Sequence, residues 1–224
     1  MFPHTPTPQR SLTFAMLVLV ALMALTQAAC TNRTPLQKLA FGLLSAVETL
    51  RDQKAVALNV LKVAQKARTN AQEEIEFTFT NRKTRVFISK WRDAEREVIE
   101  LRQDFNQTIR AADFYFAYAE KKGRKIQHIE LKKKMDQSIG TRKSAFSQAA
   151  VETNQALRVL EREIRFGNDL ITALEIAGTL NTVDRQFDEL DDLHQKTLDE
   201  MPKVSRLVEE GIRILQSELD GLAR

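Results

Sequence analysis

The chain has 224 residues, of which 34 are Lys or Arg and 30 are Asp or Glu, so its formal net charge is only +4. This near balance is neither the basic excess of a nucleic-acid-binding protein nor the acidic excess of a solvating tail. The single cysteine, Cys30, excludes an internal disulfide, so the fold must depend on burial of apolar surface.

The N-terminal 29 residues have the pattern of a bacterial export signal. One basic residue, Arg10, precedes the uncharged apolar run 12–25, and small residues follow it. A basic head, an apolar segment of about 7 to 15 residues and a small-residue exit are typical of such a signal, whereas a membrane-spanning helix needs about 20 apolar residues. We therefore predict an export signal over 1–29, a tether over 30–35 and one helical-bundle domain over 36–222.

The end of this segment, Ala28-Ala29-Cys30, resembles the lipobox of bacterial lipoproteins, in which a diacylglyceryl group is attached to the cysteine. Gln27 departs from the aliphatic residue usual at the start of that box. The resemblance implies lipidation of Cys30 and attachment to a membrane through its acyl groups. Thr31, where an Asp would signal inner-membrane retention, favours the periplasmic face of the outer membrane.

Two other outcomes remain open for this segment. Cleavage after Ala28 or Ala29 would release a soluble periplasmic protein. An uncleaved segment would anchor the chain in the inner membrane, and Arg33 and Lys38, which follow the apolar run closely, weaken the charge asymmetry that sets orientation.

The rest of the chain has the composition of long helices. No proline occurs between Pro35 and Pro202, and a proline inside a helix costs about 3 kcal/mol. Ala, Leu, Glu, Lys, Arg and Gln, all good helix formers, fill most positions. Pro35 suits the first turn of a helix, with Thr34 as its N-cap. We predict an all-α protein.

Apolar residues recur at seven-residue spacing in four long segments, which predicts an elongated antiparallel helical bundle, or coiled coil, of about four helices. Turns are expected at 80–84, Gly123 and Gly178, a break at Gly140, and kinks at Gly167 and Pro202. A short β-hairpin is the alternative near Phe79, because apolar and polar residues alternate there. The main rows are Leu36, Leu43, Leu50, Ala57, Ala64 and Ala71; Trp91, Val98, Phe105 and Ala112 beside Ala94, Leu101, Thr108 and Tyr115; Phe146, Thr153, Leu160 and Leu174; and Phe187, His194, Met201, Val208 and Leu215.

In this topology the turn near Gly123 lies at the membrane side, where aromatic and basic residues are mixed. Three consecutive aromatic residues cannot all face one core, and such a mixture suits a lipid headgroup boundary. A wide core beside a solvated charged run is the alternative. The candidate membrane-proximal tip consists of Phe114, Tyr115, Phe116, Tyr118, Lys121, Lys122, Arg124 and Lys125.

The far end carries a second mixture of aromatic and basic residues. It could bind another envelope protein or an anionic cell-wall polymer, or its aromatic residues could simply close the end of the bundle. The acidic segment 184–200 could pair with basic residues on the same bundle or on a second copy, giving self-association through helix seams. The candidate distal partner tip consists of Phe79, Arg82, Lys83, Arg85, Phe87 and Trp91.

The sequence contains no pattern that predicts catalysis. Asp191 three residues before His194 resembles half of a di-iron motif, but the second half is missing because Lys125 stands three residues before His128. A phosphate-binding loop and a serine or cysteine nucleophile motif are also absent. We predict no enzyme, metal, cofactor or nucleic-acid partner. The expected function is a lipid-anchored scaffold or adaptor, with a periplasmic chaperone or carrier holding an apolar client in a helical groove as the alternative.

Overall fold

The computed structural model of the chain describes residues 34–73, 78–177 and 184–222. These residues form five α-helices: α2 (Pro35–Gln72), α3 (Arg82–Gly123), α4 (Ile129–Ala177), α5 (Asp184–Glu200) and α6 (Pro202–Leu222). The chain divides into two compact units at Lys38, and the bundle is the second unit, Leu39–Arg224. The all-α prediction is confirmed.

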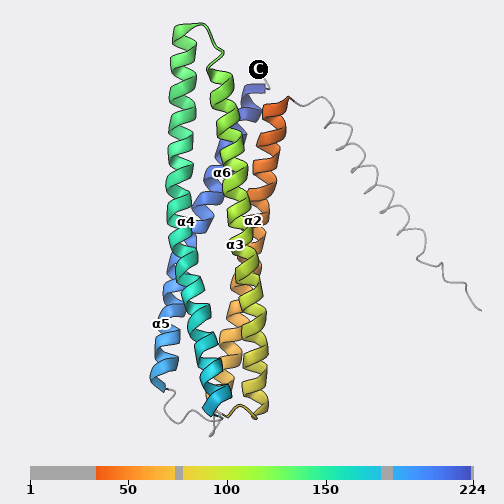
Figure 1. Ribbon diagram of the computed structural model, residues 1–224, viewed down its shortest axis with the longest axis vertical. Helices are drawn as coiled ribbons and strands as arrows, with labels where there is room; N and C mark the ends of the chain where they lie inside the picture. The colour runs from red at the N-terminus through yellow and green to blue at the C-terminus, as the bar shows by residue number, and fades with distance from the viewer. Residues whose placement is uncertain (1–33, 74–77, 178–183, 223–224) are drawn as a thin grey trace, which may run out of the picture. The chain divides into compact units, whose positions relative to one another are not determined.

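Within Leu39–Arg224 the helices form an antiparallel bundle of four rods, because α5 and α6 follow one another along the same side (Figure 1). Helix α4 packs against α3, α5 and α6. Side-chain hydrogen bonds join α2 to each of the other four described helices. Thr108 of α3 donates to the Ala46 carbonyl, 3.1 Å away, and Lys54 Nζ lies 2.5 Å from Ser205 Oγ of α6. The predicted four-helix topology is therefore observed.

The predicted heptad rows form the core. In α3 every residue of both rows is buried, and the hydroxyl of Thr108 is satisfied by the carbonyls of Ala46 and Asp104. The row through Phe187 and Met201 is buried as well, with His194 half-buried between them. A period of 3.5 residues thus brings one continuous apolar stripe of each rod to the bundle axis.

The helix ends follow local capping chemistry. Before α2, Thr34 Oγ1 accepts from the Gln37 N–H (3.3 Å) and Gln37 Oε1 accepts from the Thr34 N–H (2.7 Å), a reciprocal capping box that confirms Thr34 as the N-cap. Before α3, Asn81 Oδ1 accepts from the Lys83 N–H at 2.8 Å. Helix α3 therefore begins inside the turn predicted at 80–84.

The connection before α3 is a turn where the structure describes it, with the Asn81 N–H donating to the Thr78 carbonyl (3.1 Å). The alternating residues Ile75 and Phe77 lie outside the described residues, as do Gly178 and the predicted N-cap Asn181. The turn after Gly123 is confirmed, since Gly123 is the last residue of α3.

Two predicted interruptions have different outcomes. Helix α4 runs without interruption through Gly140, so the predicted break there is wrong. At Pro202 the interruption is confined to Met201, whose N–H still donates to the Thr197 carbonyl at 3.0 Å. Because proline has no N–H and clashes with the preceding turn, α5 ends before Pro202 and α6 begins there. The two helices continue in nearly the same direction (Figure 1), as expected for a kink.

No helix in the described ranges is both long enough and apolar enough to cross a membrane. The apolar run 12–25 and Cys30 lie outside those ranges.

Candidate functional site

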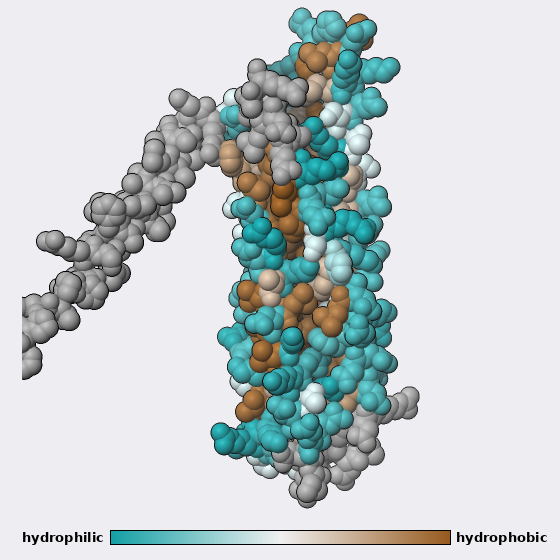
Figure 2. All heavy atoms as spheres, turned by 180° about the vertical axis from the view of Figure 1, so that it is seen from behind, coloured by the Kyte–Doolittle hydropathy of each residue, from teal (hydrophilic) through white to brown (hydrophobic). Residues whose placement is uncertain are grey.

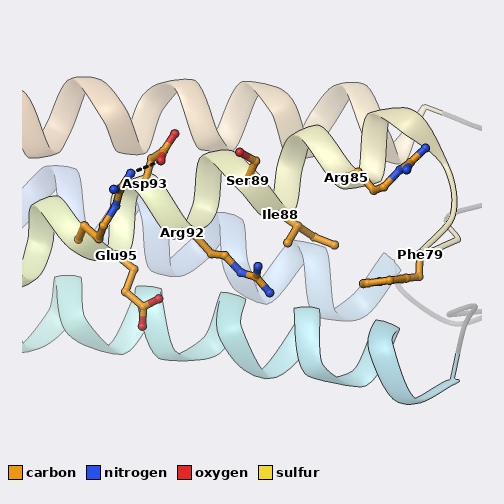
Figure 3. A pocket seen from close by; sticks show the side chains of 8 residues that line it. Phe79, Arg85, Ile88, Ser89, Arg92, Asp93 and Glu95 are labelled. Atoms are coloured by element: carbon orange, nitrogen blue, oxygen red, sulfur yellow. Dashed lines mark hydrogen bonds and ion pairs between the residues drawn. The ribbon is translucent and has the colours of Figure 1, made fainter.

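A surface depression lies on α3, near the connection that leads from α2. This distal groove is open, has a volume of about 610 Å³, and contains both apolar and charged side chains (Figure 3). Residues that follow a given position by four, seven and eleven share its face of a helix. One face of α3 therefore carries Arg85, Ser89, Arg92 and Arg96. The lining residues are Phe79, Arg85, Ile88, Ser89, Arg92, Asp93, Glu95 and Arg96.

The apolar part of the distal groove is formed by Phe79 and Ile88. Phe79 belongs to the connection before α3, and its ring points back along the helix toward Ile88 (Figure 3). Phe79 is only half-buried, so part of its ring remains open to solvent. A ligand in the groove could therefore place an apolar group against Phe79 while a polar group meets the arginines.

Two of the three arginines in the distal groove are already paired. Arg92 lies 3.3 Å from Glu175 of α4, and Arg96 pairs with Asp93. Hydrogen bonds from Lys90 and then from Arg96 lower the pKa of Asp93 below its usual value, so this carboxylate keeps its charge.

Arg85, at the open end of the groove, forms no ion pair with any residue that the structure describes. Its planar guanidinium offers several N–H donors in a fork that matches a carboxylate or a phosphate. The groove is therefore suited to an anionic group attached to an apolar one.

The structure divides the predicted distal residues into two sets. Phe87 and Trp91 are fully buried, with their ring centroids 5.7 Å apart, and Trp91 Nε1 donates to the Ile164 carbonyl at 3.2 Å. These two residues close the core and cannot contact a partner, so their assignment to a partner surface is wrong. The residues of the predicted tip that remain at the surface are Phe79, Arg82, Lys83 and Arg85.

The predicted membrane-proximal residues divide in the same way. Tyr115 and Phe116 are buried, and Phe116 packs on Phe146 of α4 with ring centroids 6.1 Å apart. Tyr118 is half-buried, with Lys122 Nζ 5.4 Å from its ring centroid. Only Phe114 among the four aromatic residues is exposed, and the basic members, Lys121, Lys122, Arg124 and Lys125, are all exposed.

A buried polar cluster joins α2, α4 and α5, and sequence reasoning missed most of it. Glu163 is fully buried, and its Oε1 accepts from Gln65 Nε2 and lies 2.9 Å from His194 Nδ1. One turn along α2, the nearly buried Arg68 pairs with Asp191. A sequence signal for it does exist, because Arg68 stands seven residues after Leu61 and so interrupts an apolar row of α2.

This buried polar cluster does not form a metal site. Across the residues that the structure describes, no three His, Cys, Asp or Glu side chains converge. Several polar atoms of the cluster, Glu163 Oε2 and Gln65 Oε1 among them, are buried without a hydrogen-bond partner in the described structure. The arrangement can fix the register of three helices, because each polar group has its partner on another helix.

A second depression, of about 460 Å³, lies between α3 and α4 and opens widely to solvent. Phe105 and Ile109 of α3 face Ala150 and Val151 of α4 there, with polar residues on either side. It is confined to these two helices and is separate from the distal groove.

Comparison of the chain with protein-family models, with curated proteins and with solved structures finds no match.

Proposed function

We propose that the protein is a lipid-anchored cell-envelope scaffold or adaptor on the periplasmic face of the outer membrane. In this proposal acyl groups on Cys30 hold the chain at the membrane, and the distal groove binds a partner protein. The observation that carries the proposal is Arg85, which has no ion pair with any residue in the described ranges, beside the half-buried Phe79 ring at one end of a long bundle.

The dimensions of the bundle support an adaptor. From Leu39 to Gln72, α2 rises about 50 Å at 1.5 Å per residue. The distal groove lies at the end of the bundle where α2 ends, whereas α2 begins at the opposite end of the bundle (Figure 1). A partner at the groove would therefore be held well away from the tether.

The packing favours a scaffold over a carrier. The largest side chains on the helix seams, such as Trp91, Phe87 and Leu101, are fully buried between the helices. A carrier would need an apolar surface that continues along several helices, whereas each of the two depressions is local. Binding at a charged end is the simpler use of such a closed bundle.

The chemistry of the distal groove favours an acidic protein segment that also carries an apolar side chain. The carboxylate would bind the guanidinium fork of Arg85, and the apolar group would cover Phe79 and Ile88. Pairing at an exposed arginine is screened by salt, so most of the affinity would come from burial of the apolar group.

The tether is tested by Cys30→Ala in the full chain, compared with the original by membrane fractionation and by incorporation of a labelled fatty acid. Loss of both label and membrane retention is expected. A wild-type chain that takes up no label would contradict the lipid anchor, whatever its partner.

The groove is tested separately by a photo-crosslinking residue at Ser89, with the same residue at the exposed Lys196 of α5 as the control. A discrete crosslinked partner is expected only from Ser89. Arg85→Gln should weaken this product, whereas Asp93→Asn, which frees Lys90 and Arg96, should strengthen it. Equal products from both positions, or no response to either variant, would refute binding at the groove.

A further inference from the structure

The turn between α3 and α4 projects beyond its neighbours. The hydrogen bond from Thr108 to the Ala46 carbonyl sets these two residues level on antiparallel helices. Seven residues further along each helix, Leu39 is level with Tyr115, and α3 then continues to Gly123, about 12 Å beyond. Figure 1 shows the hairpin of α3 and α4 extending past α6 as well. We call residues 114–137 the hairpin tip.

The hairpin tip exposes large apolar side chains. Ile129 has 82% of its surface exposed, Phe114 68%, Leu131 52% and Met135 40%. Single exposed apolar residues are ordinary on a protein surface, but Ile129, Leu131 and Met135 lie together in the first two turns of α4, at the outer end of the projection. Phe114 lies further down α3, because its neighbour Phe116 packs on Phe146, about 25 Å along α4 from Ile129. Figure 2 shows apolar side chains interspersed with hydrophilic ones at this end of the bundle.

The hairpin tip is also the most basic part of the chain. It contains seven Lys or Arg and three Asp or Glu, so its net charge is +4, as large as that of the whole protein. Glu120, one of the three acids, is already paired with Lys143 at 2.6 Å. Among the described residues, Lys132, Lys133 and Lys134 form no ion pair.

This combination matches the headgroup layer of an anionic membrane. Apolar side chains can enter the boundary between headgroups and acyl chains to a depth of about 5–10 Å, while lysines remain with the lipid phosphates. Basic residues within a Debye length of an anionic surface are attracted to it. A nucleic acid would satisfy the lysines but would leave Ile129 and Leu131 in water.

The chain path places the hairpin tip within reach of a tethered surface. Helix α2 enters the bundle at the end where the tip projects (Figure 1). The nine residue steps from Cys30 to Leu39 span at most about 30 Å even when fully extended. If Cys30 is lipidated, as proposed above, the tip meets the same membrane.

We propose that the hairpin tip is a second membrane contact, which binds the headgroup layer of an anionic bilayer through Ile129, Leu131 and Met135 together with Lys132, Lys133 and Lys134. The contact orients the bundle, so that the distal groove faces away from the membrane. Its position relative to the tether rests on the proposed lipid anchor, but its affinity for lipid does not.

The test uses the full chain with Cys30→Ala, which removes both the acylation site and the only native thiol. A single cysteine is then introduced in the hairpin tip, Gln127→Cys, or at the far end, Thr80→Cys, and labelled with an environment-sensitive fluorophore. Vesicles of phosphatidylglycerol and phosphatidylcholine should shift the emission of the tip label to shorter wavelength. The far label, and the tip label with pure phosphatidylcholine, should not shift.

Two matched triple variants carry the tip label. Lys132→Gln, Lys133→Gln and Lys134→Gln together should abolish most of the shift, whereas Lys62→Gln, Lys66→Gln and Lys196→Gln, on α2 and α5, should preserve it. No shift with anionic vesicles, equal shifts at both labels, or a shift that survives the tip triple variant would overturn the proposal. Emission that responds only to added unlabelled protein would also overturn it and would assign the tip to a second copy.

The proposed lipid anchor at Cys30 and the proposed membrane contact of the hairpin tip can be refuted independently. Fatty-acid labelling of the wild-type chain reports on Cys30 alone, and the fluorescence experiment is done without that residue. A negative result in one leaves the other experiment informative.

Discussion

Gly167 of α4 lies directly against the indole ring of Trp91 of α3. A Cβ atom on Gly167 would overlap the ring carbons of Trp91, well inside any permitted contact distance. The ring is held in place because Trp91 Nε1 donates to the Ile164 carbonyl, and the whole side chain is buried. The glycine therefore serves close packing of two helices and does not interrupt α4.

Gly167→Ala should lower the free energy of unfolding by about 1–3 kcal/mol, because the buried indole cannot move aside without losing its hydrogen bond. Gly140→Ala is the matched control in the same helix, since nothing lies within 4 Å of a Cβ placed there. Alanine suits a helix interior better than glycine, so the control should raise stability by up to about 1 kcal/mol. Chemical denaturation of both variants measures the difference. Equal stabilities would show that α3 and α4 are not packed as described.

The sequence predicted the seams of the bundle because seven-residue spacing depends only on helix geometry. It could not predict which of Phe114, Tyr115 and Phe116 are buried, since their burial depends on which helix lies alongside. Phe146 of α4 supplies a partner for Phe116 in the core, and Phe114 is left outside. In the same way the sequence could not predict that Gly167 makes room for Trp91, because that ring belongs to another helix.

Arg68 and Asp191 form a pair whose members differ greatly in burial. The side chain of Arg68 is 5% exposed, whereas that of Asp191 is 56% exposed. Asp191→Ala leaves a buried cation with only Gln72 and the Phe187 ring beside it, and should cost about 2 kcal/mol. Arg68→Met leaves a carboxylate that water can solvate, and should change stability by less than about 1 kcal/mol.

Urea denaturation of the two single variants and the double variant measures this asymmetry. The double variant should resemble Arg68→Met, because the buried charge is gone in both. If Arg68→Met is the more damaging single change, the packing of its aliphatic stem, and not its charge, governs the site.

Lys54 makes the free energy of unfolding of the bundle depend on pH in the alkaline range. Burial lowers the pKa of Lys54 from 10.5, and nearby Glu209 offsets part of that shift. The unfolded chain therefore binds more protons than the folded one between the lowered pKa and 10.5, so the free energy of unfolding rises with pH across that window. Lys54→Met should be at least as stable as the wild type at neutral pH, and its advantage should shrink as pH approaches 10.5. Denaturation curves measured across this range test the sign, and an advantage that grows with pH would contradict it.

The candidate sites were harder to predict than the seams. Arg85, Ser89, Arg92 and Arg96 share a helical face that could have been found by spacing alone, but only the folded connection places Phe79 beside them. Glu163 has no apolar spacing to mark it, because it lies outside the predicted row of Phe146, Thr153, Leu160 and Leu174. Glu163 is buried because α2 and α5 pack against it, through Gln65 and His194.

Glu163 should contribute more to stability than any exposed acid on α4, because two buried side chains depend on it. Glu163→Ala would leave Gln65 Nε2 and His194 Nδ1 without an acceptor and would open a cavity, at a cost of about 2–4 kcal/mol. Glu163→Gln retains a side-chain oxygen of the same reach and should cost less. Glu161→Ala, two residues earlier, breaks a partly exposed pair with Arg102 and should cost about 1 kcal/mol or less. Thermal and urea unfolding of the three variants rank them, and a Glu163→Ala protein as stable as Glu161→Ala would mean that water already satisfies Gln65 and His194.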